Sequence, residues 1–240
     1  MFKKKGFIMA FILIISMIGM TACKKNVGAP EDNAQAEENE DETNTEETQE
    51  HLIGFSVIDM ENPYFITLES AAKAELEEDG YRMITKNPET DPQLQETQIQ
   101  EMIDEGIEAI ILSPVDWEKI TPSLQALKKA GVKIINVDTQ VKEMEYVDAY
   151  IGSDNQKAGY ICGEDLITKC PDGGKIAILE CPTQNSINDR ITGFEEAIAQ
   201  AENGFEVVER MDTKGEFELA LEAAQKILEE HPDISAIMCG

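Results

Sequence analysis

Residues 109–137 read AIILSPVDWEKITPSLQALKKAGVKIINV, two apolar runs with a helical pattern between them. The runs Ala109–Leu112 and Lys133–Val137 are short and rich in Ile, which is typical of buried strands. Trp117–Ala130 has helical spacing and stops at Gly131, a residue type that favours helix ends. Two buried strands joined by a helix indicate neighbouring parallel strands connected by a right-handed crossover.

The same alternation continues in both directions from this unit, between Leu52 and Gly240. We expect the remaining strands at Leu52–Ile58, Arg82–Lys86, Tyr146–Ile151, Lys175–Leu179, Phe205–Met211 and Ser235–Met238. We expect the remaining helices at Phe65–Glu78, Asp91–Glu105, Asn155–Lys169, Ile187–Ala201 and Phe217–Glu230. The pattern therefore predicts an α/β fold with two doubly wound parallel-sheet lobes, 52–152 and 153–240, divided near Gly152-Ser-Asp-Asn155.

The second lobe is expected to be incomplete. Only about three strands follow residue 153, fewer than a sheet usually has. The strand that ends beside Gly240 should also feed a helix. We therefore interpret the chain as truncated at its carboxyl end, with strand edges and apolar surface uncovered. We expect it to bind ligand weakly or not at all unless the missing part is supplied.

Residues 1–22 have the pattern of a signal peptide rather than of a folded segment. A basic start at Lys3-Lys-Lys5 precedes an apolar run from Phe7 to about Gly19, which is shorter than the roughly 20 residues of a membrane-spanning helix. Met20-Thr-Ala-Cys23 resembles a bacterial lipobox, which predicts that the Cys23 thiol carries a lipid. An uncleaved signal anchor is the alternative.

Residues 23–51 are predicted to form a lipidated, acidic, disordered tether. Glu31–Glu50 has ten acidic residues, no basic ones and almost nothing apolar, so it cannot offset the entropy cost of ordering. Charge repulsion would extend it as a spacer from the membrane, although a merely solubilising run would have the same structure.

Charge and cysteine content exclude several classes of function. The net charge of −28 includes this acidic segment, and no Lys/Arg cluster follows the first residues, which argues against nucleic-acid binding. The cysteines after Cys23 show no CxxC spacing and are predicted to be buried free thiols, a disulfide being the alternative. His51 and His231 are far apart in sequence, so a zinc site has little support.

Ligand-binding residues are expected beyond the carboxyl ends of the strands, where loops and helix starts converge. Asn62 can cap the helix that starts at Pro63, and Tyr64 and Phe65 then stand at the mouth of a cleft. Aromatic faces can stack on the C–H patches of a sugar ring. The alternative is that Phe65 belongs to the core and Tyr64 to the surface.

Two later strand ends offer polar groups. Ser113 can hydrogen-bond a hydroxyl, while Asp116 is better explained as a helix cap, and Trp117 fits either the cleft or local packing. Asp138 could accept hydrogen bonds from two neighbouring hydroxyls, or it could cap a turn. In the second lobe Arg190 could present its rigid fork of donors to ligand oxygens, unless it is solvated.

No catalytic motif accompanies these residues. The sequence contains no G-x-S-x-G, P-loop, G-x-G-x-x-G or HExxH pattern, and nothing fixes Asp138 and Asp154 at the separation of a glycosidase pair. We therefore expect a binding protein that is not an enzyme and uses no cofactor or metal.

From Leu52 to Gly240 the chain resembles the ribose-type periplasmic sugar-binding proteins, the type I solute-binding proteins of ABC transporters. The matching pieces, in order, are IDMENPYF, LSPVD, AGVKIINVDT, IGSDNQKAG, NDRITGF and EEHPDISAIMCG. The resemblance implies ligand contacts by Asn62, Tyr64, Phe65, Ser113, Asp138, Thr139 and Arg190, and by Phe217, whose spacing departs from the family pattern. Ser113 stands where ribose binders of this family often have Asn. Thr139 stands where they have Arg, and this departure favours another sugar or a polyol.

The resemblance also implies a mechanism and partners. The lobes would close around a monosaccharide or polyol, and the closed form would dock on an ABC permease at the outer face of the cell membrane. We expect a monomer that binds no nucleic acid. The alternative is a sugar-sensing input protein for a chemoreceptor or sensor kinase. A LacI-type repressor is set aside, because a signal sequence and tether occupy the place of its helix-turn-helix.

Overall fold

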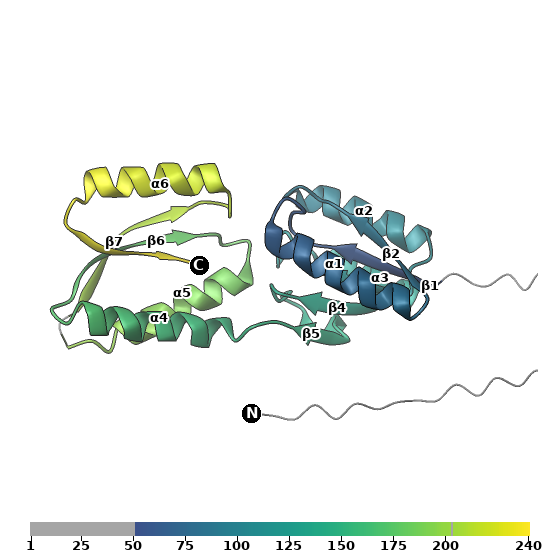
Figure 1. The fold of residues 1–240 in the computed structure, drawn as a ribbon, viewed down its shortest axis with the longest axis horizontal. Helices are drawn as coiled ribbons and strands as arrows, with labels where there is room; N and C mark the ends of the chain where they lie inside the picture. The colour runs from purple at the N-terminus through teal and green to yellow at the C-terminus, as the bar shows by residue number, and fades with distance from the viewer. Residues whose placement is uncertain (1–50, 203) are drawn as a thin grey trace, which may run out of the picture. The chain divides into compact units, whose positions relative to one another are not determined.

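The apolar strands form two separate parallel sheets, as the alternating pattern predicts (Figure 1). Residues 51–202 and 204–240 are the part of the chain that this computed structural model describes. The first sheet has the strand order β2-β1-β3-β4-β5 and the second the order β7-β6-β8, with every neighbouring pair parallel. The predictions for residues 1–22, for Cys23 and for the tether lie outside the described residues, except that His51 already belongs to β1.

The first lobe contains the first five strands. Its elements are β1 (His51–Ser56), α1 (Pro63–Glu78), β2 (Tyr81–Lys86), α2 (Pro92–Asp104), β3 (Ala109–Leu112), α3 (Thr121–Ala130), β4 (Lys133–Val137), η1 (Met144–Tyr146) and β5 (Ala149–Ile151). Helix α1 packs on one face of the sheet, where Phe55 and Phe65 are buried. Helices α2 and α3 cover the other face through Met102 and Leu127. Chain crossovers on both faces make this a doubly wound sheet.

The second lobe repeats the arrangement on a smaller scale. Its elements are α4 (Asn155–Lys169), β6 (Gly174–Glu180), α5 (Asn185–Ile198), β7 (Phe205–Asp212), α6 (Phe217–Glu230) and β8 (Ile234–Cys239). Phe194 of α5 and Leu166 of α4 pack on one face of the sheet. Ile227 of α6 is buried on the other face. Both lobes thus have the same layered plan.

Helix α3 begins four residues later than the predicted start at Trp117. If the helix started there, Pro122 would fall in its interior, where proline lacks the N–H that the helix needs and clashes with the preceding turn. The structure instead places Thr121 and Pro122 in the first turn. Asp116 caps the turn before the helix, since its Oδ1 accepts from the amides of Glu118 and Lys119 at 3.1 and 3.0 Å.

Glycines allow α4 and α5 to approach each other more closely than most helix pairs. A Cβ added at Gly159 would lie 1.8 Å from the carbonyl oxygen of Arg190, and one at Gly193 would lie 1.9 Å from that of Gln156. Only glycine fits where two backbones come this close. The contact fixes the amino-terminal turn of α4 against the part of α5 that carries Arg190.

The cysteines are only partly as predicted. Cys162, Cys170, Cys181 and Cys239 are free thiols, and no disulfide occurs among residues 51–202 and 204–240. Only Cys181 is buried, however, while Cys162 and Cys239 are exposed. The prediction of burial is wrong for these two, because both line an open groove on the surface of the second lobe, together with Phe194 and Met238.

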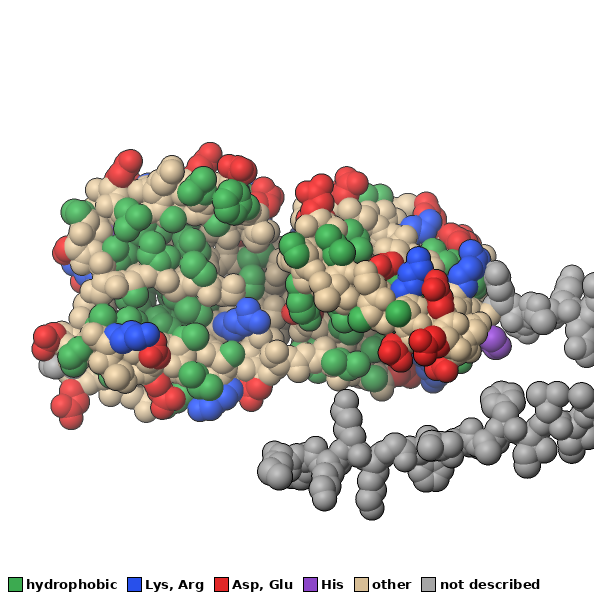
Figure 2. Space-filling view, viewed as in Figure 1, with side chains coloured by type: hydrophobic (Ala, Val, Ile, Leu, Met, Phe, Trp, Pro, Cys, Tyr) green, Lys and Arg blue, Asp and Glu red, His purple; other side chains and the backbone are tan. Residues whose placement is uncertain are grey.

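Strand β8 forms an edge of the second sheet, since β6 is its one hydrogen-bonded neighbour among the described strands. An open, largely apolar groove of about 320 Å³ follows this edge and is lined by residues that include Leu166, Phe194 and Met238. Figure 2 shows hydrophobic side chains on the surface of this lobe between α6 and α4. In the described part of the chain, no helix has both the length and the apolar content that a bilayer crossing requires.

Candidate functional site

The loop after β1 presents two aromatic side chains in different environments. Asn62 caps α1, because its Oδ1 accepts from the Tyr64 amide at 3.0 Å, and Pro63 occupies the first turn. This start orients Phe65 inward, where it is 3% exposed, while Tyr64 remains 54% exposed. The two rings meet edge to face with centroids 5.1 Å apart. Phe65 therefore supports Tyr64 from the core, and Tyr64 has a ring free to contact a ligand.

Asp138 follows β4 in a conformation that its neighbours hold in place. Its φ of 61° lies in the left-handed region, which few residues other than Gly, Asn and Asp adopt. The Asp138 amide donates to the Ile151 carbonyl at 3.0 Å, and its carbonyl accepts from the Tyr150 hydroxyl at 2.8 Å. Strand β5 thus fixes the backbone that carries the Asp138 carboxylate.

Two hydroxyl groups near these strand ends differ in their bonding. Ser113 is fully buried after β3, and its Oγ has no hydrogen-bond partner among the described residues. An unsatisfied buried hydroxyl is costly and unusual in a native structure. Thr139 Oγ1 lies 2.8 Å from Ser186 Oγ of the second lobe and donates more weakly to Asp138 Oδ2 at 3.4 Å. Thr139 therefore links the lobes, and its hydroxyl is already engaged.

Arg190 is held at the junction of α4 and α5. Its Nε donates to Asn155 Oδ1 at 2.9 Å, and Asn155 is the first residue of α4. The close approach of the two helices sets this distance. The bond uses one donor of the guanidinium, and the terminal nitrogens make no hydrogen bond among the described residues. Arg190 is thus oriented by one bond while donors remain for ligand oxygens.

Electrostatic interactions bring Tyr64, Asp138 and Arg190 into one neighbourhood. Burial raises the pKa of Asp138, and the positive charge of Arg190 opposes that rise. Burial likewise raises the pKa of Tyr64. The negative charge of Asp138 raises this pKa further, and the positive charge of Arg190 lowers it. These three residues span 126 positions of the sequence, and they come from both lobes.

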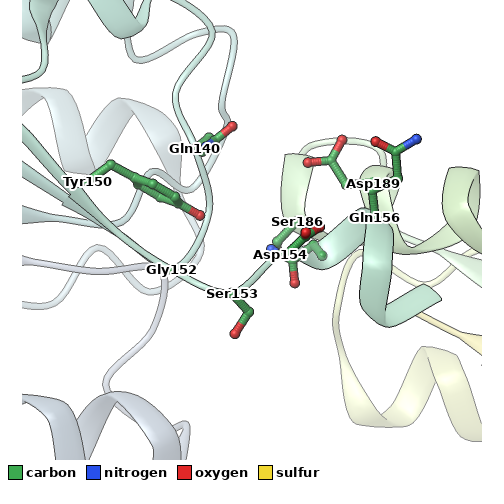
Figure 3. Close-up of a pocket in the computed structure, with 9 residues that line it drawn as sticks. Gln140, Tyr150, Gly152, Ser153, Asp154, Gln156, Ser186 and Asp189 are labelled. Carbon is green, nitrogen blue, oxygen red and sulfur yellow. The ribbon is translucent and has the colours of Figure 1, made fainter. Parts of the chain in front are cut away.

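A polar pocket of about 370 Å³ adjoins this group. It is lined by Gln140, Tyr150, Gly152, Ser153, Asp154, Asn155, Gln156, Ser186 and Asp189. Figure 3 shows Gln140 and Tyr150 on one side and Ser186 and Asp189 on the other, with the segment Gly152–Ser153 running between them.

Three of the lining residues are bonded to predicted site residues: Tyr150 to Asp138, Ser186 to Thr139, and Asn155 to Arg190. The pocket and the predicted residues Asp138, Thr139 and Arg190 are therefore parts of one region.

Tyr150, Ser186 and Asp189 are members of this region that the sequence interpretation did not identify. Burial raises the pKa of Tyr150, and the nearby carboxylates of Asp138 and Asp189 raise it further. Burial also raises the pKa of Asp189, with a contribution from Asp154. The signal that could have found Tyr150 is the strand-end rule already applied to β3 and β4, because Tyr150 lies near the end of β5.

Two aromatic residues considered in the sequence are not joined to this group. Phe217 is 77% exposed at the start of α6, and no hydrogen bond or ring contact of the described chain links it to Asp138 or Arg190. Trp117 lies elsewhere along the boundary between the lobes. Its amide donates to the Thr183 carbonyl at 3.0 Å, and Lys142 Nζ lies 5.9 Å from its ring centroid.

The fold and these residues define a class of protein. The chain has two doubly wound parallel sheets, and a polar pocket lies where they join. An aromatic side chain, carboxylates and a guanidinium lie near this pocket. This combination is typical of two-lobed binding proteins for small polar solutes. The comparison with protein families agrees, since the family described as periplasmic binding protein domain matches residues 53–240. This chain belongs to that family, whose members bind ligands rather than catalyse reactions.

Individual relatives are similar along most of the chain. The ribose import binding protein RbsB of Bacillus subtilis (strain 168) is 26% identical over 227 residues, which are 94% of this chain and 70% of the relative. The D-ribose/D-allose-binding protein of Pseudomonas aeruginosa is 29% identical over 189 residues, 75% of this chain and 59% of the relative.

A solved structure is similar as well. The crystal structure of an ABC transporter solute binding protein from Mycobacterium smegmatis, with bound glycerol, has a TM-score of 0.73 and 30% identity. The similarity covers 79% of this chain and 66% of that one. The chain therefore spans between 59% and 70% of the length of these three proteins.

Proposed function

We propose that this chain is the solute-capturing part of a sugar transporter: it binds a monosaccharide or related polyol outside the cell and delivers it to an ABC permease. The family membership supports a solute-binding role. The ligands named for the relatives, ribose, allose and glycerol, are small polyhydroxylated molecules. They are the ligand class that the polar groups of the site suit best.

One observation carries the proposal. Tyr64 in the first turn of α1, Asp138 directly after β4 and Arg190 in α5 interact electrostatically, and they lie beside a polar pocket. A tyrosine ring can stack on a sugar face, while a carboxylate accepts and a guanidinium donates hydrogen bonds to hydroxyls. A neutral, hydroxyl-rich ligand satisfies all three groups together.

Capture would proceed by closure of the lobes 52–152 and 153–240 about the segment Gly152–Ser153. Among the described residues, two hydrogen bonds cross the boundary, Thr139 Oγ1 to Ser186 Oγ at 2.8 Å and the Trp117 amide to the Thr183 carbonyl at 3.0 Å. Such bonds are formed in the closed arrangement and broken on opening, so they bias the equilibrium between the two. Because these bonds are few, ligand binding can determine whether the open or the closed arrangement is favoured.

The proposal includes a location. A lipid on Cys23 would anchor the protein at the outer face of the cell membrane, with residues 23–51 as a tether and residues 1–22 removed as a signal peptide. Tethering keeps a monomeric binding protein at high local concentration near its permease. Metabolic labelling with a radioactive fatty acid tests this anchor, since Cys23→Ser should remove the label and release the protein from the membrane.

The binding function is tested by saturation-transfer NMR, which detects weak binding, with ribose, allose, glycerol and other polyols offered to the purified chain. We expect at least one of them to bind saturably. Arg190→Gln should weaken that binding about tenfold or more, because a charge-assisted hydrogen bond contributes about 1.5–3 kcal/mol. Arg210→Gln is the matched control in the same lobe, since Arg210 pairs with Glu180 and Glu195 instead. The proposal fails if no polyol binds, or if both substitutions have equal effects.

A further inference from the structure

A second group of chemically active side chains lies on the second lobe. Glu209, Glu230 and His231 each offer one metal-ligand atom, and the three atoms lie within 4.8 Å of one another. The histidines alone gave no reason to expect a metal site, because His51 and His231 are far apart in sequence. The fold brings the three residues together, since Glu209 comes from β7 and the other two residues from the end of α6.

A β-bulge directs Glu209 to this position. Ile176 of β6 pairs with Val207, but the next residue, Ala177, pairs with Glu209, so one residue of β7 is unpaired. The consequence is a change of face along β7. Val207 packs with the cluster under α4 and α5, whereas Met211 packs with the cluster under α6. Glu209, two residues before Met211, therefore lies on the α6 face. Bulges often re-aim a side chain in this way.

The position of the group suits a cation. The carboxyl end of a helix carries partial negative charge, so Lys or Arg is favoured there and Glu is disfavoured. The last turn of α6 nevertheless has no basic residue and ends with Glu230. Glu209 takes part in no ion pair of the described chain, and the cation that pairs with Glu230 is the exposed Lys226, at 3.8 Å. Two carboxylates are thus brought together at a negative helix end with little compensation.

We propose that Glu209, Glu230 and His231 bind a divalent transition-metal ion, with Zn²⁺ the best fit. Zinc accepts imidazole and carboxylate ligands, and a site with three protein ligands leaves one position for water. Atoms around tetrahedral zinc are about 3.3 Å apart, so side-chain rotations alone bring this group into range. The imidazole makes the group different from a cluster of carboxylates, because it selects Zn²⁺ over Ca²⁺ or Mg²⁺.

The site would be separate from the sugar pocket. Helix α6 starts at the carboxyl end of β7 and returns to the amino end of β8, so His231 lies toward the opposite edge of the sheet from the strand-end loops. A bound ion would connect β7 to the end of α6 and stabilise the lobe. The site does not depend on the proposed transport function.

The test uses proton NMR of the histidine rings during a Zn²⁺ titration of the full chain. The chain has only two histidines, so each serves as a reference for the other. We expect the His231 ring signals to change saturably and with one-to-one stoichiometry. Glu209→Gln should weaken the affinity about tenfold or more. His51→Gln should leave it unchanged, although His51 Nδ1 lies 2.7 Å from a carboxylate oxygen of Glu108.

Ring signals are used rather than total zinc uptake because Cys162 and Cys239 are exposed free thiols, and thiols are also zinc ligands. Circular dichroism of each variant establishes that it is folded. The proposal is overturned if His231 does not respond at millimolar Zn²⁺. It is also overturned if Glu209→Gln binds as tightly as the unaltered chain, since His231 would then act as an isolated surface histidine.

Discussion

Replacing Gly193 with Ala should destabilise the second lobe and misplace Arg190 at the same time. The added Cβ would lie 1.9 Å from the Gln156 carbonyl oxygen, about 1.5 Å short of ordinary contact, and the obstacle is backbone rather than a flexible side chain. Overpacking of this kind costs about 3 kcal/mol at the upper end. Alanine recovers up to about 1 kcal/mol through its better helix propensity. The net loss should therefore be about 2 kcal/mol.

For a chain of this size, such a loss lowers the melting temperature by about 4–8 °C. Differential scanning calorimetry measures it, and Gly204→Ala is the control, because a Cβ at Gly204 meets nothing within 4 Å. Separation of α4 from α5 should also lengthen the Arg190 to Asn155 hydrogen bond of 2.9 Å and weaken ligand binding. A melting temperature within 1 °C of the unaltered chain would refute the argument that this glycine permits the helix contact.

Three further predictions concern buried or charged side chains. Asp138→Asn should raise stability at pH 7 while weakening ligand binding. Burial raises the pKa of Asp138 in the folded state, so its ionisation costs stability as the pH rises above about 3.9, the pKa of an unfolded Asp. The cost is about 1.4 kcal/mol for each pH unit that separates the folded and unfolded pKa values. Thermal melts at pH 3 and 7 should show the advantage of the Asn variant only at pH 7.

Asp148→Asn should act in the opposite direction. Lys128 and the Ile134 amide hold the pKa of Asp148 below its usual range. The Asn variant should therefore lose about 1 kcal/mol of folding stability at neutral pH. Thermal melts should show this difference shrinking as the pH falls below about 4. Asn136→Ala should lower the free energy of unfolding by about 2–4 kcal/mol, because the buried Asn136 side-chain amide donates hydrogen bonds to the carbonyls of Leu112 and Thr139. Urea unfolding measures this loss. An unchanged midpoint would mean that water replaces the amide.

The layered fold could be predicted because its signals are local. Ala109–Leu112, Lys133–Val137, Asn155–Lys169 and Phe217–Glu230 have the bounds that apolar periodicity and end residues indicate. The errors arise where another constraint competes with periodicity. Pro122 delays α3, and β5 is shorter than predicted because Met144–Tyr146 forms a 3₁₀ turn before it.

The candidate site could be predicted only in part. The strand-end rule finds Asp138 from sequence, because an acidic residue directly after a buried strand has few other places to point. Tyr150 and Ser186 escape it, since their roles depend on contacts between elements that are distant in sequence, with Asp138 and Thr139 respectively. The hydrogen bond between the Thr139 and Ser186 hydroxyls is likewise a tertiary contact, and no sequence pattern predicts it.

The most direct test of the account is an amide NMR titration of the chain with the polyol that it binds best. The shared neighbourhood of Tyr64, Asp138 and Arg190 predicts that amides near all three residues, hence in both lobes, shift together with one apparent dissociation constant. Shifts confined to one lobe, or located away from these residues, would contradict the claim that the two lobes bind one ligand between them.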